Sequence, residues 1–103
     1  MAKDKLGKCY ELSFKFITEN EHLEKAGLHI RLIHGTIYSK SLKKRIDHAW
    51  IEMGNVVIDS SVNSYARKEE YYAFHEAKAM ARYTKKEAFK IGLEAGGNYG
   101  PWT

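Results

Sequence analysis

Three residue types that together support nucleophilic catalysis occur in this sequence, as Cys9, His48 and Asp59. A cysteine attacks a carbonyl carbon once a histidine has taken its proton, and a carboxylate beside the imidazole fixes the tautomer and stabilises the imidazolium. Cys9 is the single cysteine of the chain, so it cannot form an intramolecular disulfide. The three residues lie far apart in sequence, and the chemistry therefore requires a fold that brings them together.

The segment 48–59 predicts a β-hairpin that would bring the histidine and the aspartate together. Its first half alternates between two faces, and the Val-Val-Ile run that follows is β-branched, which suits a strand interior. Between the two halves, Gly54 and Asn55 tolerate the positive φ angles of a tight two-residue turn. Met53 is therefore expected to pair with Val56.

Continuing that register pairs Trp50 with Asp59 and His48 with Ser61. His48 and Asp59 then point to the same side of the sheet as diagonal neighbours, within reach of each other's side chains. Asp47 alternates to the opposite side and is a poor partner for the imidazole. A three-residue turn would shift the register by one residue and send Asp59 to the other face, so this prediction depends on the turn.

Residues 8–19 predict an amphipathic helix that places Cys9 in its first turn. Cys9, Leu12 and Phe16 form one apolar stripe on this helix. The positive end of the helix dipole would favour a thiolate at that position, and two lysines nearby act in the same direction. The alternative interpretation is a small buried residue in a helix stripe, which is common for cysteine.

The rest of the chain predicts one more strand and two more helices. The strand covers residues 28–37 and is joined to the hairpin by a polar, basic loop at 38–44. A linker rich in Ser and Asn follows at 60–66, and residues 68–82 carry a small-residue stripe that predicts a helix. We therefore expect an α+β fold in which an N-terminal helix packs on a three-stranded antiparallel sheet and two C-terminal helices follow.

The C-terminal part begins with a capping box in which Thr84 and Glu87 open the last predicted helix. Gly96 and Gly97 are expected to end that helix. The tail at 98–103 carries two aromatic residues, more than a disordered tail would hold, so it is expected to fold back on the core.

The composition is that of a globular protein, with 44% hydrophobic and 13% aromatic residues. A length of 103 residues is enough for one core, and we expect a single domain over 1–103. No apolar run approaches the length of a membrane span, and the N-terminal residues lack the apolar segment of a secretory signal, so a cytoplasmic protein without a membrane partner is expected. The formal net charge of +4 does not by itself indicate a nucleic-acid partner.

Four further residues are candidates for a substrate pocket: His34, Trp50, Tyr71 and Tyr72. His34 continues the apolar face of the strand at 28–37, and the two tyrosines stand near the start of the helix predicted at 68–82. The alternative for the histidine is a hydrogen-bonded core residue, and for the tyrosines ordinary packing.

At the cysteine helix and the hairpin, the chain resembles the papain-like superfamily, and most closely its transglutaminase-core branch. The resemblance is carried by Cys9 at the start of a helix, by the His-Ala-Trp-Ile-Glu strand that begins at His48 and by the Val-Ile-Asp strand that ends at Asp59. The chain is also similar to small bacterial and phage proteins of this type, in segments at 7–11, 34–35, 71–72 and 99–102.

This resemblance implies a minimal papain-like or transglutaminase-like core. Cys9 would be the nucleophile, His48 the general base and then the acid, and Asp59 the orienting carboxylate.

The chain departs from larger members of that superfamily because no Gln or Asn precedes the cysteine to complete an oxyanion hole. The backbone N–H of Cys9 is one possible donor, and the second would come from Tyr38, His34 or Trp50. Losing one such donor typically costs on the order of 10²–10³ in turnover, so catalytic power is in question more than the chemistry.

Two main hypotheses follow from the sequence. The first is a thiol-dependent enzyme without cofactor or metal, a cysteine peptidase, amidase or acyl transferase that acts on a peptide, protein or amide substrate. The second is a catalytically silent member of the same fold that works as a protein-binding module or phage-encoded inhibitor.

Two weaker hypotheses are a nucleic-acid surface and a metal site. The nucleic-acid surface would use the basic residues of a segment that is more simply a solvated loop, namely Lys40, Lys43, Lys44 and Arg45. The metal site would use the cysteine, the histidine and the aspartate, but their spacing matches no metal-binding motif.

Overall fold

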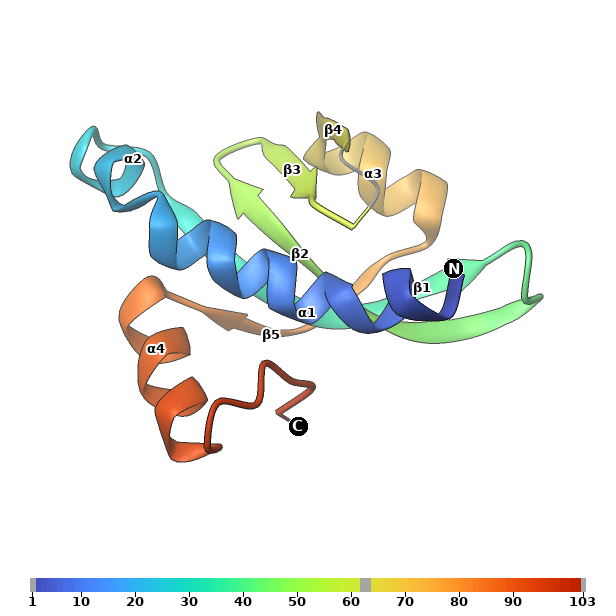
Figure 1. Ribbon diagram of the computed structural model, residues 1–103. Coiled ribbons are helices and arrows are strands. Elements are labelled where there is room, and N and C mark those ends of the chain that lie inside the picture. Colours follow the sequence, from blue (N-terminus) through green and yellow to red (C-terminus); the bar gives the residue numbers. More distant parts are fainter. Residues whose placement is uncertain (1, 62–63, 103) are drawn as a thin grey trace.

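The computed structural model describes residues 2–61 and 64–102 (Figure 1). This part contains four helices and one antiparallel sheet of five strands, so the predicted α+β class is confirmed and the predicted number of strands is wrong. In spatial order the strands are β4 (Ser64–Arg67), β3 (Val56–Asp59), β2 (Lys44–Met53), β1 (Ile30–Ser39) and β5 (Lys78–Tyr83). The helices are α1 (Ala2–Glu19), α2 (Glu21–Lys25), α3 (Lys68–His75) and α4 (Lys85–Glu94).

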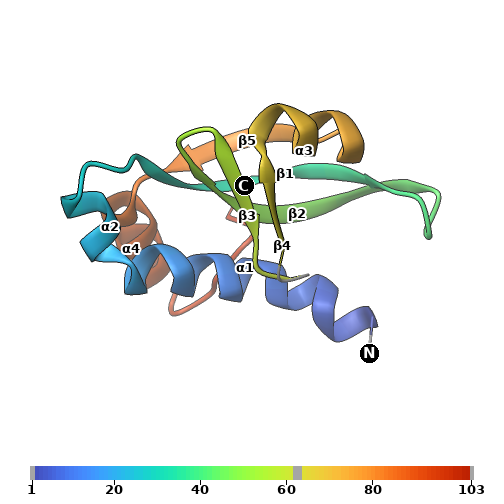
Figure 2. The ribbon, with the colours of Figure 1, turned by 90° about the horizontal axis from the view of Figure 1, so that it is seen from above.

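Helices cover both faces of the sheet (Figures 1 and 2). On one face, Ile17 of α1 and Ala88 of α4 form a core cluster with Leu32 of β1. On the other face, Tyr71 of α3 packs in a second cluster with Trp50 of β2. Because successive strand residues point to opposite faces, β1 and β2 supply side chains to both clusters.

The hairpin of β2 and β3 forms with the predicted turn and register. Met53 pairs with Val56, and Gly54 adopts a φ of 60° in the turn between them. A glycine accepts this left-handed conformation at no steric cost. The hairpin prediction is therefore confirmed at its turn.

The ladder between β2 and β3 is shorter than predicted. It contains three residue pairs and does not include the pairs predicted for Trp50 with Asp59 and for His48 with Ser61. The reason is that β3 ends at Asp59, while β2 continues alongside β1 through His48. Past Trp50, β2 no longer has β3 as its neighbour.

The helix predicted at 68–82 is wrong. Only Lys68–His75 is helical, and Glu76 follows as a C-cap in the left-handed conformation, with φ 48°. The chain then forms β5, which pairs antiparallel with β1. Along β5 exposed and half-buried residues alternate, as on an edge strand with one covered face.

The connections between elements also differ from the prediction. The linker expected at 60–66 contains β4, which pairs with β3, and residues 62 and 63 lie outside the described part. The strand expected at 28–37 covers Ile30–Ser39, and β2 begins at Lys44. The loop expected at 38–44 is therefore a short turn at the tip of an arm made by β1 and β2, which projects beyond the other strands (Figures 1 and 2).

The capping box and the folded tail are confirmed. Thr84 Oγ1 accepts a hydrogen bond from the Glu87 backbone N–H, and Glu87 Oε1 accepts one from the Thr84 N–H. In the tail, the ring of Trp102 lies 6.2 Å from that of Phe14 and 5.2 Å from that of Tyr83. None of the helices described within 2–61 and 64–102 is long and apolar enough to cross a membrane.

Candidate active site

His48 and Asp59 are joined by a buried hydrogen bond between β2 and β3. His48 Nε2 lies 2.9 Å from Asp59 Oδ2, and the two residues are 5% and 3% exposed. The two side chains therefore lie on the same side of the sheet, as predicted, although His48 and Asp59 are not paired with each other in the β2–β3 ladder. A carboxylate at this distance accepts a hydrogen bond from Nε2–H, so Nδ1 is the ring nitrogen that can gain or lose a proton.

Three further hydrogen bonds hold the Asp59 carboxylate. Its Oδ1 accepts from the backbone N–H of Ser61 at 3.2 Å and from the Ser61 hydroxyl at 2.6 Å, and its Oδ2 accepts from the Tyr71 hydroxyl at 2.7 Å. Burial alone would raise the pKa of Asp59, but the bond and charge of His48, then Ser61 and Tyr71, lower it to about 2. Asp59 is therefore an anion throughout the neutral pH range.

The imidazole of His48 is held in its protonated form. Burial would lower the pKa of His48, but hydrogen bonding and negative charge from Asp59 and Cys9 outweigh it and raise the pKa to about 9. The second ring nitrogen, Nδ1, is fully buried. Nδ1 is thus the nitrogen through which the ring can exchange a proton with a thiol.

Cys9 is brought to this imidazole by α1, but not from the helix start. The helix begins at Ala2, so about two turns precede Cys9 and the predicted place in the first turn is wrong. The dipole acts mainly within the first turn, so it does not account for an activated thiol here. The cysteine is fully buried in a cluster with Tyr10 and Ala49. Its interaction with His48 contributes to the raised pKa of that imidazole.

The structure gives a different account of the oxyanion donors considered from sequence. A residue inside a helix donates its backbone N–H to the carbonyl four residues earlier, so the N–H of Cys9 is already used within α1. The indole N–H of Trp50 donates to the Tyr72 hydroxyl at 3.3 Å. Tyr38 lies on the arm, 36% exposed.

The four candidate pocket residues do not form one pocket. Tyr71 bonds Asp59, as described above, whereas Tyr72 bonds Glu52 on the same face of the sheet. Trp50 is fully buried between these two pairs, with its rings 6.2 Å from the His48 ring and 5.7 Å from the Tyr72 ring.

His34 lies on the opposite face of the sheet from His48. Its partner across the ladder is Ala49, and its ring is surrounded by those of Tyr10, Tyr83 and Trp102 at 4.8, 5.2 and 4.8 Å. Burial lowers the pKa of His34 to about 4, so the ring is neutral at pH 7. His34 lies among the aromatic side chains of the core and does not adjoin the imidazole of His48.

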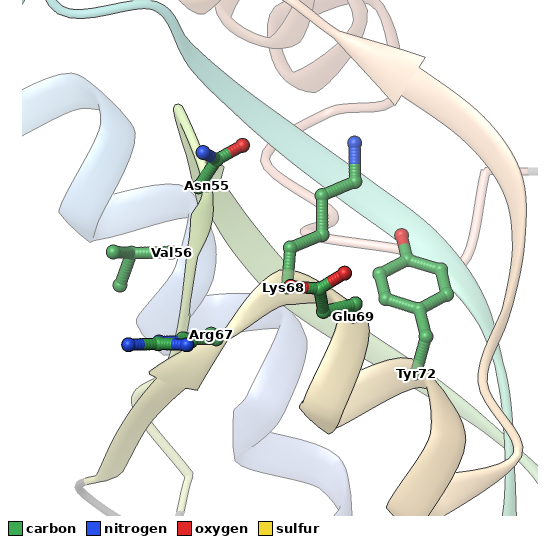
Figure 3. A pocket seen from close by; sticks show the side chains of 6 residues that line it. All are labelled: Asn55, Val56, Arg67, Lys68, Glu69 and Tyr72. Atoms are coloured by element: carbon green, nitrogen blue, oxygen red, sulfur yellow. The ribbon is translucent and has the colours of Figure 1, made fainter.

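A large pocket lies beside the turn of the hairpin, away from the cysteine. Its volume is about 580 Å³, and Figure 3 shows Lys68 and Tyr72 projecting from α3 toward the same side of it. The pocket walls come from Asn55, Val56, Arg67, Lys68, Glu69 and Tyr72. Cys9, His48 and Asp59 are not among these residues, so they do not line this pocket.

Sequence reasoning missed Ser61 and the role of Tyr71. Ser61 follows Asp59 by two residues, a spacing at which an Asp side chain often accepts the backbone N–H of its own turn. That pattern was visible in the sequence. The bond from Tyr71 depends on where α3 packs, which no local pattern indicates.

The structure also shows the surroundings of the residues considered for a nucleic-acid surface and for a metal site. Lys40 lies over the ring of Phe74, 4.5 Å from its centroid, and Arg45 donates to Thr36 and to the Glu76 carbonyl. Within residues 8–61 and 64–102, no group of three or more His, Cys, Asp or Glu side chains is arranged to hold a metal ion.

Comparisons with protein-family models, with curated proteins and with solved structures gave no match.

Proposed function

We propose that this chain is a thiol enzyme that acts on amide or acyl bonds, with Cys9 as the nucleophile. His48 would serve as general base and then as general acid, and Asp59 as the carboxylate that orients it. One observation carries the proposal: a buried His48 is bonded to Asp59 through one ring nitrogen and coupled electrostatically to the only thiol of the chain. This is the order of groups that nucleophilic catalysis by a thiol requires.

In the proposed resting state the Cys9 thiol proton already resides on His48 Nδ1, so the reaction begins from a thiolate–imidazolium pair. The thiolate then attacks the substrate carbonyl carbon, a C–S bond forms and the carbonyl oxygen becomes an oxyanion. When this intermediate collapses, the C–N bond breaks and the His48 Nδ1–H proton passes to the leaving amine. A thioester on Cys9 remains, and His48 is now neutral.

The thioester is resolved by water or by an amine. His48 takes a proton from the acceptor, which attacks the thioester carbonyl, and the C–S bond breaks to return the thiolate. Water gives hydrolysis, as in a peptidase or amidase, and an amine gives acyl transfer, as in a transglutaminase. We propose that the chain has a papain-like or transglutaminase-like core. The support is the order of elements along the sequence, in which a helix with the cysteine precedes a strand with the histidine and a strand with the aspartate.

The proposed location is the cytoplasm, because a thiol nucleophile is kept reduced there.

Intact-mass spectrometry with an acyl-directed electrophile, such as a peptide vinyl sulfone, tests the proposal. The wild-type chain is expected to gain one adduct at Cys9, and Cys9→Ala is expected to gain none. His48→Gln is expected to gain the adduct at a rate at least tenfold lower than the wild type. His29→Gln is the matched control because His29 is exposed and outside the site. Equal labelling of the wild type and His48→Gln would contradict the proposed base.

A second candidate function is a silent protein-binding module of the same fold. The observation in its favour is that Cys9 is 0% exposed, so a substrate carbonyl reaches the sulfur only if the site opens. Absence of labelling in folded wild-type protein, together with one partner that is retained at equal strength by the wild type and Cys9→Ala, would favour this function over the enzyme.

A further inference from the structure

The carboxylate of Asp59 is fixed by donors from three different parts of the chain. His48 of β2 and Tyr71 of α3 both bond Oδ2, while Ser61 bonds Oδ1 through its N–H and its hydroxyl. A carboxylate has about four acceptor positions, so this one is fully occupied. Its orientation is therefore set by Tyr71 and Ser61 as much as by the strand that carries it.

Tyr71 is held so that it can only act as a donor to Asp59. It is 4% exposed, and its ring lies 5.6 Å from Trp50 and 4.5 Å from His75. Burial, followed by the charge of Asp59, raises the pKa of the Tyr71 phenol above its usual range. The hydroxyl thus keeps its proton over the pH range in which His48 titrates.

We infer that Tyr71 is a positioning residue of the Cys9–His48–Asp59 site, through which α3 fixes the carboxylate that orients His48. The inference rests on the proposed function for its catalytic meaning, but the hydrogen bond itself can be tested without activity. It also gives α3 a role that the sequence did not suggest, since Tyr71 was considered there only as a candidate pocket residue or as a packing residue. Small displacements of an orienting group reduce turnover because the base leaves its productive geometry.

The neighbouring tyrosine provides a matched control. Tyr72 stands on the same helix and also donates to a buried carboxylate, but that carboxylate is Glu52, which Arg82 and Lys68 also contact. Tyr71→Phe and Tyr72→Phe therefore remove the same atom from adjacent residues, and only one of these atoms bonds Asp59.

The experiment is a carbon-detected NMR titration of the Asp59 carboxyl in the wild type, Tyr71→Phe and Tyr72→Phe. The pKa of Asp59 is expected to rise by about one pH unit in Tyr71→Phe, because a donor to the anion is lost, and to stay unchanged in Tyr72→Phe. The other titratable groups near Asp59 are His48, Cys9 and His75, and none is altered in either variant. An Asp59 titration that is the same in all three proteins would overturn the inference.

Two additions keep the outcome interpretable. If Tyr71→Phe does not fold, site-specific 3-fluorotyrosine at position 71 replaces it; the more acidic phenol is a stronger donor, so the pKa of Asp59 should fall, and an unchanged value would overturn the inference. Thiol labelling is measured on the same samples. A shifted Asp59 with an unreactive Cys9 would refute the enzyme and keep the Tyr71 bond, whereas a reactive Cys9 with an unshifted Asp59 would refute only the role of Tyr71.

Discussion

Nε2 of His48 and Oδ2 of Asp59 lie 2.9 Å apart, although the β2–β3 ladder ends at the pair of Ile51 and Ile58. The bond therefore spans the place where the ladder ends, rather than a pair inside it. Both residues are almost completely buried, so the imidazolium and the carboxylate interact with little solvent screening. Asp59 therefore contributes to keeping the imidazole of His48 positively charged.

Replacing the aspartate should change the titration of His48. In Asp59→Asn the carboxylate charge is lost while the burial that opposes protonation remains, so the pKa of His48 should fall from about 9 by at least one unit. Two-dimensional NMR of the histidine ring measures it. Asp47→Asn is the control, because Asp47 is exposed and points to the opposite face, and its variant should titrate as the wild type does.

The stability of the protein should depend on pH through the same pair. The pKa of His48 rises on folding from 6.5 to about 9. Its contribution to the free energy of unfolding is therefore fully present below pH 6.5 and is lost as the pH rises through about 9. The pKa of Asp59 falls from 3.8 to about 2, so its contribution is full above pH 3.8 and is lost as the pH falls through about 2. Maximal stability is expected between these limits, from about pH 4 to 6.5.

Urea unfolding at a series of pH values checks this dependence. The free energy of unfolding of the wild type should fall by on the order of 3 kcal/mol between pH 6.5 and 9. In His48→Gln this fall should be mostly absent. A wild-type curve that is flat over this interval would show that the imidazole is not held in its charged form.

The part of the site that local patterns specify was predictable. The Gly54 turn fixes the register, and the alternation of β2 then places His48 and Asp59 on one side. The capping box at Thr84 is equally local, because both of its bonds lie within four residues.

The parts that depend on tertiary packing were not predictable. The segment after α3 is rich in Ala, Met, Lys and Arg, which are good helix formers, yet it forms β5 because β1 offers it an unpaired edge. The break at Glu76 carries no sequence signal, since non-glycine residues seldom adopt a positive φ. The early start of α1 was missed because the residues before Cys9 lack an apolar stripe.

Gly35 should tolerate no side chain. A methyl group there would overlap the Lys78 carbonyl of β5 and come within 2.9 Å of Cη2 of Trp50, both of which are fixed in the sheet or core. Gly35→Ala should therefore lower the free energy of unfolding by about 1–3 kcal/mol, as overpacking does. Chemical denaturation measures the loss.

Gly54→Asn is the control for that substitution. Gly54 has a φ of 60° and nothing within 4 Å of the site of an added Cβ. Asparagine accepts this conformation better than other non-glycine residues, so the change should stay within about 1 kcal/mol. Equal losses in the two variants would mean that the close approach of β5 and Trp50 to Gly35 is not the cause.

The most direct test of the central claim is the NMR titration of the His48 ring in the wild type and in Cys9→Ala. If the thiol and the imidazole form one coupled pair, the pKa of His48 should lie near 9 in the wild type and fall in the variant, because the negative charge and hydrogen bonding of Cys9 are gone. An identical titration in both proteins would contradict the coupling and, with it, the proposed nucleophile.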